Sequence, residues 1–169
     1  MTSSPHAHLE KTGDACILTM TQELPAAPDP VWRAITEPAQ LREWAPYDAS
    51  ASLGIASAVV TLTTVGAPAP HVVQTAVVRA DAPEHLEFDW GGNQLHWQLQ
   101  PLGAGTRLTL RTRIPVSFAA MGAAGWHVCL EALEHLLAGQ PSGRKVGMQL
   151  MQDPAWQRLR ADYARQFGV

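Results

Sequence analysis

The sequence has few cysteines, little charge and no strongly basic stretch. Its two cysteines, Cys16 and Cys129, are too few for a disulfide framework and fit a reducing compartment. The formal net charge of −3 lacks the positive footprint expected of a nucleic-acid binder. Charged residues make up only 16% of the chain and hydrophobic residues 46%, which argues against disorder. The 169 residues therefore indicate one folded domain, residues 1–169.

Targeting and membrane signals are also scarce. Residues 1–14 contain several charged side chains and no apolar run, so they do not resemble a signal peptide, and we expect them to be flexible. The longest stretch of low polarity, residues 118–130, is interrupted by His127 and is too short to cross a bilayer. We therefore expect a soluble, cytoplasmic protein without membrane insertion.

Proline marks the beginning of several predicted helices. An acidic residue precedes a proline at Asp29-Pro30, Glu37-Pro38 and Asp153-Pro154. Proline is favoured at the first helical position, and an acidic side chain stabilises the positive end of a helix. These signals predict short helices over residues 30–35 and 38–44 and a last helix over 154–167.

Apolar and polar residues alternate over residues 15–24 and again, with turns, over 57–113. This period of two predicts antiparallel strands with one face on a core and the other in water. Gly91-Gly92 and Gly103 provide the positive φ angles of tight hairpins. The strands predicted at 58–65 and 72–79 alternate less cleanly but are rich in valine and threonine. Together they predict a meandering sheet.

A long amphipathic helix is predicted over residues 119–138, and Gly139 and Pro141 end it. Its apolar stripe comprises Gly122, Trp126, Cys129, Leu130, Leu133, Leu136 and Leu137. The opposite face, predicted to be solvated, comprises His127, Glu131, Glu134 and His135. Residues 140–152 are predicted to be a linker to the short C-terminal helix.

These elements can assemble if the long helix buries its stripe on the apolar face of the sheet. A curved sheet closed by one helix leaves a concave apolar space of the kind that binds small ligands. The predicted inner face carries large aromatic side chains, which suit both core packing and contact with a flat ligand. The residues expected to line the cavity are Trp44, Trp90, Trp97, Met121, Trp126, Leu130 and Leu133.

The order and spacing of four segments resemble a known superfamily. They are LPAAPDPVWRAITEPAQLREWAP (24–46), DAPEHLEFDWG (81–91), LHWQLQPLGAGTRLTLRTRI (95–114) and GWHVCLEALEHLLAG (125–139). The chain resembles the SRPBCC (START-like, Bet v 1-like) superfamily, and within it the bacterial homologues of the activator of the heat-shock-protein-90 ATPase. The resemblance implies an α+β helix-grip fold: a curved antiparallel sheet around a long C-terminal helix, with two short helices between the first and second strands. The segment DASASLGIASAVV departs from the family pattern, which places a charged, double-glycine strand start there.

Candidate reactive side chains have plainer interpretations. His127, Glu131 and His135 share one helix face, but residues i and i+8 lie about 12 Å apart, too far for both histidines to bind one metal ion. Cys129 lies mid-helix on the apolar stripe without an evident activating base, which favours packing over nucleophilic chemistry. The sequence therefore predicts no catalytic residue, no metal site and no cofactor.

The resulting functional hypothesis is binding of a small hydrophobic ligand, lipid-like or aromatic, without evident catalysis. One alternative is a polyketide cyclase/aromatase-like enzyme, which would require an inward polar group such as His71 or His96. Another is a co-chaperone-like interaction module with a chaperone partner, which would use an exposed apolar outer surface. The sequence leaves the ligand's identity and the oligomeric state open, a homodimer included.

Overall fold

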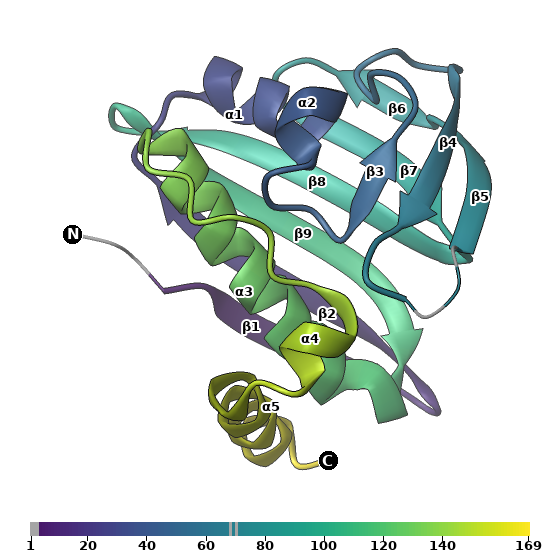
Figure 1. Cartoon of the computed structure of the whole chain (residues 1–169), viewed down its shortest axis with the longest axis vertical. Coiled ribbons are helices and arrows are strands. Elements are labelled where there is room, and N and C mark those ends of the chain that lie inside the picture. The colour runs from purple at the N-terminus through teal and green to yellow at the C-terminus, as the bar shows by residue number, and fades with distance from the viewer. Residues whose placement is uncertain (1–3, 68, 70) are drawn as a thin grey trace.

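The computed structural model describes residues 4–67, 69 and 71–169, which form two antiparallel sheets and a set of helices (Figure 1). The larger sheet has the spatial order β1 (His6–Thr12), β2 (Ala15–Leu24), β9 (Gly105–Pro115), β8 (Asn93–Leu102), β7 (His85–Trp90) and β6 (Arg79–Asp81). The smaller sheet has the order β3 (Tyr47–Ala49), β4 (Val59–Thr64) and β5 (His71–Ala76). The helices are α1 (Pro28–Thr36), α2 (Pro38–Leu41), η1 (Val116–Phe118), α3 (Ala119–Leu137), α4 (Gly147–Met151) and α5 (Pro154–Phe167).

The long helix α3 lies across one face of the larger sheet, and α1 and α2 lie between β2 and β3 along the chain (Figure 1). This arrangement confirms the predicted α+β helix-grip architecture. Trp126, Cys129, Leu130 and Leu133 of α3 are all buried, as the apolar stripe predicts. The core therefore lies between α3 and the sheet.

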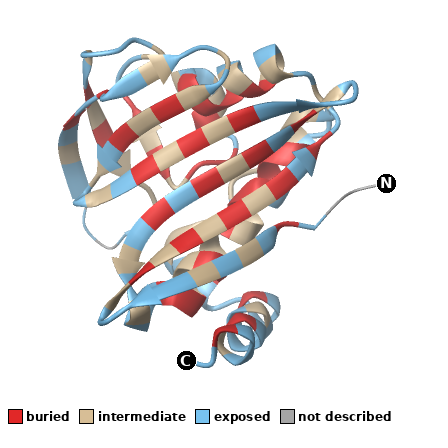
Figure 2. Ribbon diagram, turned by 180° about the vertical axis from the view of Figure 1, so that it is seen from behind, coloured by how far each residue is buried: buried red, intermediate tan, exposed pale blue. Residues whose placement is uncertain are grey.

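The central strands show the alternation from which they were predicted. Buried residues alternate with more exposed ones along β7, β8 and β9, and Figure 2 shows the resulting stripes on the back of the sheet. The inward residues of β9 and β8 face each other in register, with Leu110 opposite Trp97. Such cross-strand pairs fix the register, because a slip by one residue would expose the whole apolar row.

Parts of the predicted organisation need correction. Residues 1–14 are not simply a flexible segment, because His6–Thr12 forms strand β1 on β2. The 140–152 linker contains the short helix α4. The strand predicted at 72–79 is divided into β5 and β6, and the sheet is not one meander. The division falls at residues 77 and 78, because the amide of Val77 donates to Ala58 next to β4 of the smaller sheet, whereas the amide of Val78 donates to Glu87 on β7 of the larger one.

The face of α3 predicted to be solvated is partly covered. Glu134 is only 5% exposed and accepts a 2.8 Å hydrogen bond from Nε2 of Gln22 on β2. His127 is half-buried, and its Nδ1 lies 2.7 Å from the hydroxyl of Tyr163 on α5. The prediction is therefore wrong for these two residues, because periodicity places side chains on a face but does not reveal what later packs on it. Glu131 and His135 are exposed.

The expectation that no segment is long enough for a membrane also needs correction. The η1–α3 segment, Val116–Leu137, is 22 residues long, and its most apolar 18-residue window has a mean hydropathy of 1.3, so its length and composition suffice to cross a membrane. Half of its most apolar window is buried inside the protein, as in a core helix. The apolar surface of this helix is thus used largely against the sheet.

Candidate functional site

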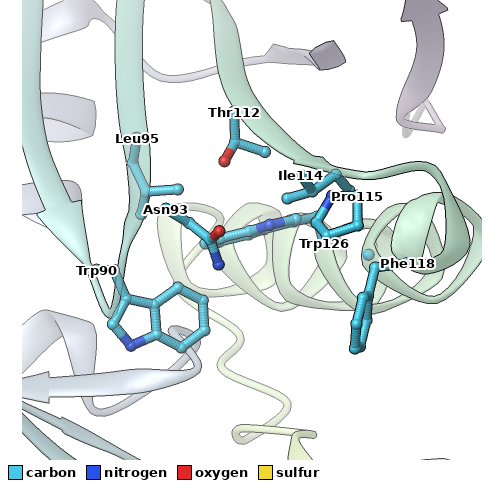
Figure 3. A pocket seen from close by; sticks show the side chains of 9 residues that line it. Trp90, Asn93, Leu95, Thr112, Ile114, Pro115, Phe118 and Trp126 are labelled. Carbon is cyan, nitrogen blue, oxygen red and sulfur yellow. The ribbon is translucent and has the colours of Figure 1, made fainter. Parts of the chain in front are cut away.

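A pocket of about 320 Å³ lies between the larger sheet and the N-terminal half of α3. We call it the inner pocket, and its lining residues are Trp90, Asn93, Leu95, Thr112, Ile114, Pro115, Phe118, Gly122 and Trp126. They come from the β7–β8 hairpin, the end of β9, η1 and α3. Figure 3 shows most of these side chains arranged around the space. The walls are mainly apolar, with a hydroxyl and an amide among them.

The end of β9 places the hydroxyl in an otherwise apolar row. Residues 108, 110, 112 and 114 alternate with outward arginines and threonine, so Thr112 occupies an inward position after Leu108 and Leu110. Thr112 is 3% exposed, and no described residue forms a hydrogen bond with its Oγ1. Figure 3 shows this hydroxyl on the side of Asn93 and Trp126. Burying a hydroxyl without a hydrogen-bond partner costs free energy, so the presence of Thr112 at this position requires an explanation.

Trp90 and Trp126 form a second feature of the lining. Their ring centroids are 6.1 Å apart at an interplanar angle of 77°, an edge-to-face contact. Nε1 of Trp90 donates a 3.1 Å hydrogen bond to Oγ1 of Thr64 at the end of β4. The Trp90 ring is therefore held between the smaller sheet and α3.

A smaller pocket of about 170 Å³ adjoins this pair of rings. We call it the side pocket, and it is lined by Pro46, Trp90, Gly122, Gly125, Trp126, Cys129, Val146, Gly147 and Leu150. Trp90, Gly122 and Trp126 belong to both linings, so the two pockets meet at these residues. Val146, Gly147 and Leu150, at and just before α4, contribute to the lining of the side pocket.

Only part of the expected cavity lining reaches either pocket. Trp90 and Trp126 line both, as expected. The other expected residues belong to neither lining: Trp44, Trp97, Leu130 and Leu133 lie in the filled core at 0–1% exposure, and Met121 is half-buried. Trp44, for example, donates from Nε1 to the carbonyl oxygen of Ala34 at 2.9 Å. The expected lining is therefore right for Trp90 and Trp126 and wrong for the other five residues.

No ionisable side chain is among the residues that line the inner pocket. His96 lies on the outer face of β8, with Nδ1 4.0 Å from Oε1 of Glu87, and burial lowers its pKa. His71 is exposed at the start of β5. Neither histidine turns inward, so neither supplies the acid–base group that a cyclase-like mechanism would need.

Cys129 lines the side pocket but is poorly suited to act as a nucleophile. The residue is 3% exposed, and burial raises the pKa of its thiol to about 12. The thiolate is the reactive form, so a raised pKa makes the thiol inert at neutral pH. The structure thus agrees with the packing role expected for this cysteine.

The histidines of α3 have separate partners. Nε2 of His127 lies 3.4 Å from Oε1 of Glu131, whereas Nδ1 of His135 lies 2.9 Å from Oγ of Ser142. Within the described part of the chain, no group of three His, Cys, Asp or Glu residues is arranged to hold a metal ion.

Comparison with known proteins identifies the family and the fold. A family model described as polyketide cyclase/dehydrase and lipid transport matches residues 15–138. The structure is similar to EF2215, a protein of unknown function from Enterococcus faecalis, with a TM-score of 0.73 and 15% identity over 96% of this chain and 90% of that one. CalU16 from Micromonospora echinospora gives a TM-score of 0.66 and 19% identity, with 99% of both chains covered. DynU16, from the dynemicin biosynthetic locus, gives 0.63 and 23% identity over 79% of this chain and 52% of that one.

These similarities to solved structures establish the fold but do not identify a ligand. No curated protein matches the sequence. The finer resemblance to homologues of the heat-shock-protein-90 ATPase activator is not confirmed by the family match.

Several lining residues were not anticipated from the sequence. The alternation of β9 does place Thr112 and Ile114 on the inner face, so that signal was available. Pro115 and Phe118 lie at the turn into α3, where no periodic pattern indicates depth. Gly122 and Gly125 carry no side chain, and only the folded structure shows that they line the side pocket and that Gly125 faces open space.

Proposed function

This chain belongs to the polyketide cyclase/dehydrase and lipid transport family, and on that premise we propose that it binds a small, mainly apolar ligand in the inner pocket. The observation that carries the proposal is the pocket itself, about 320 Å³ with tryptophan, leucine, isoleucine, proline and phenylalanine in its walls. Ligand sites in proteins are typically concave, mostly apolar and of this size class. The ligand class is lipid-like or aromatic.

Binding is favoured over catalysis by the chemistry of the lining. The family description also includes cyclases and dehydrases. Such reactions need a proton donor or acceptor within hydrogen-bond reach of the substrate. The inner pocket offers a threonine hydroxyl and an asparagine amide, neither of which titrates near neutral pH. A co-chaperone-like docking role does not require an internal pocket, so the pocket supports ligand binding over that role as well.

A thermal-shift screen of the full chain tests this proposal. The panel contains flavonoids, naphthols, fatty acids and hydrophobic dyes, and native mass spectrometry of the purified protein searches for a compound that co-purifies. A ligand at 100 times its Kd should stabilise the protein by about 2.7 kcal/mol. If no compound in the panel raises Tm and none co-purifies, the proposal fails.

A pair of variants ties any binding to the inner pocket. Ile114→Phe enlarges a half-buried lining residue and should remove the stabilisation by ligand, because the added ring occupies the open space. Arg111→Ala changes an exposed residue on the same strand and should leave ligand binding intact. Equal loss or equal retention of binding in both variants would place the ligand elsewhere.

A further inference from the structure

The inner and side pockets share three lining residues, Trp90, Gly122 and Trp126, two of them on α3. Gly122 belongs to both linings, and Gly125 lies one turn further along the helix in the side pocket. Neither glycine has a side chain of its own: a Cβ at Gly125 would meet open space, whereas one at Gly122 would lie 3.2 Å from Cδ1 of Ile114. The wider inner pocket and the narrower side pocket therefore adjoin at the tryptophan pair.

Gly125 has no evident packing reason to be glycine. A Cβ at this position would have no other heavy atom within 4 Å, apart from its sequence neighbours and the backbone of its own helix turn. Glycine inside a helix costs roughly 1 kcal/mol relative to alanine. Nearby positions that do pack into the core, Ala119, Ala123 and Ala124, are alanine and fully buried. A methyl group at Gly125 would occupy open space beside the side pocket that this residue lines.

The inner pocket has a polar group that the side pocket lacks. Thr112 lines the inner pocket and is 3% exposed, and its hydroxyl, on the side of Asn93 (Figure 3), is itself buried without a hydrogen-bond partner among the described residues. A ligand oxygen at this position would supply that partner and remove the cost of the unpaired group.

We propose that the ligand has two unequal parts: a flat ring with an oxygen substituent beside Thr112 in the inner pocket, and a narrow apolar arm that runs along Gly122 and Gly125 into the side pocket. This assignment rests on the proposed function and specifies the ligand class within it. Trp90 and Trp126 contact the ligand where ring and arm join. Gly125 is the residue that determines the length of the arm.

The test uses 1-naphthol and a series of its 4-alkyl derivatives, with straight arms of one to six carbons, titrated against the full-length protein. Affinity should rise about threefold to fourfold per methylene until the side pocket is full, and then level off. A series whose affinity does not depend on arm length would overturn the proposal while leaving the proposed function intact. If no member binds and the broader panel also fails, the proposed function itself is lost.

Gly125→Ala separates a ligand role from a structural one. The variant should raise the Tm of the empty protein, since alanine favours the helix, yet weaken binding of the hexyl compound about tenfold or more. Binding of unsubstituted 1-naphthol should not change. His135→Ala, on the exposed side of the same helix, serves as the control. It should leave the dependence of affinity on arm length unchanged. Equal weakening of every compound by Gly125→Ala would contradict the proposed arm site.

Thr112→Val tests the polar end. It should lower the affinity for 1-naphthol about threefold to tenfold, which corresponds to the loss of one hydrogen bond. The affinity for 1-methylnaphthalene should not fall. If both compounds respond equally to the variant, the ligand oxygen does not lie beside Thr112 and that part of the proposal is wrong.

Discussion

Two buried threonines of β9 differ in what their hydroxyls contact. Oγ1 of Thr106 donates a 2.8 Å hydrogen bond to the carbonyl oxygen of Ala26, whereas Oγ1 of Thr112 has no partner within the described residues. Both residues are at most 3% exposed. Loss of a paired buried hydroxyl leaves an acceptor unsatisfied, but loss of an unpaired one removes a desolvation cost.

We therefore expect opposite effects from the same chemical change in the empty protein. Thr112→Val should raise the free energy of unfolding by about 1 kcal/mol, and Thr106→Val should lower it by about 1–3 kcal/mol. Urea unfolding of both variants beside the wild type measures the difference. A Thr112→Val protein as destabilised as Thr106→Val would show that the Thr112 hydroxyl has a partner in solution.

Glu134 makes stability depend on pH in a direction unusual for a carboxylate. Burial raises its pKa, although the Gln22 side chain donates a hydrogen bond to it. A raised pKa in the folded state means that the unfolded chain loses its proton first. Protonated Glu134 therefore contributes its full stabilisation below the pKa of about 4.3 in the unfolded chain. This contribution is lost as the pH rises through the pKa of Glu134 in the folded protein.

Glu134→Gln should remove this loss. The variant and the wild type should be similarly stable near pH 4, and the variant should become the more stable of the two as the pH approaches neutrality. Thermal unfolding of both proteins across this range measures the gap. A gap that narrows with rising pH would mean that the ionised carboxylate is stabilised in the fold.

Individual tryptophans illustrate what the sequence reveals about a site. Alternation and helical periodicity placed Trp90, Trp97 and Trp126 on inward faces, and all three do face inward. The pattern cannot tell which inward residue borders open space, because that depends on how neighbouring side chains fill the volume. Trp97 is packed edge-to-face against Trp44 at 5.9 Å and is fully buried, whereas Trp90 borders both pockets.

Helix α5 packs on the outside of α3 through a small polar contact. Tyr163 meets Nδ1 of His127, and Oε1 of Glu131 lies on the other side of the imidazole. Burial lowers the pKa of His127, while Glu131 opposes the shift. The folded protein therefore favours neutral His127, and the unfolded chain takes up a proton first as pH falls below about 6.5.

We expect acidification from pH 7 to pH 5 to weaken the attachment of α5 before the sheet responds. Amide hydrogen exchange should become faster in Pro154–Phe167 and stay slow in β8 and β9, after correction for intrinsic exchange rates. His127→Gln, which cannot be protonated, should remove the pH dependence. Equal acceleration in α5 and the central strands would instead indicate loss of global stability.

The elements differ in how well the sequence predicted them. Asp153 accepts a hydrogen bond from the amide of Ala155 at 2.9 Å, and the helix that follows has the predicted bounds, because its start signal is local. Strand β2 likewise has its predicted bounds. Strand β1 was missed, because it lies at the sheet edge and buries little, so its pattern lacks the contrast of a core strand. A helix start could be predicted from its local side chains, whereas the pairing of an edge strand could not be predicted from its sequence.

The interior is filled at one end of the molecule and hollow at the other. Trp44, Tyr47, Phe88 and Trp97 pack together at 0% exposure, with ring contacts of 5.8–5.9 Å. The N-terminal half of α3 borders the two pockets instead. In a closely packed core, removing side-chain atoms leaves a cavity and lowers the free energy of unfolding. A residue beside an existing space makes fewer contacts, so its truncation removes fewer of them.

Trp97→Ala should therefore cost about 3–5 kcal/mol, as truncation in a filled core does. Trp90→Ala should cost less, even though it also loses the bond to Thr64, because its removal merges spaces that are already open. Urea unfolding with comparable m-values measures both. A larger loss from Trp90→Ala would mean that the pockets are closed in the unliganded protein.

The position of α5 beside β1 also affects how copies of this chain meet one another. β1 is an outer strand of the larger sheet, and such strands offer unpaired backbone groups to neighbouring molecules. Nε2 of Gln166 on α5 donates a 2.9 Å hydrogen bond to the carbonyl oxygen of Ala7, and His8, Glu10 and Lys11 place polar and charged groups along the same strand. A chain that ended before Pro154 would lose this cover, and its sheets would be free to join edge to edge into aggregates.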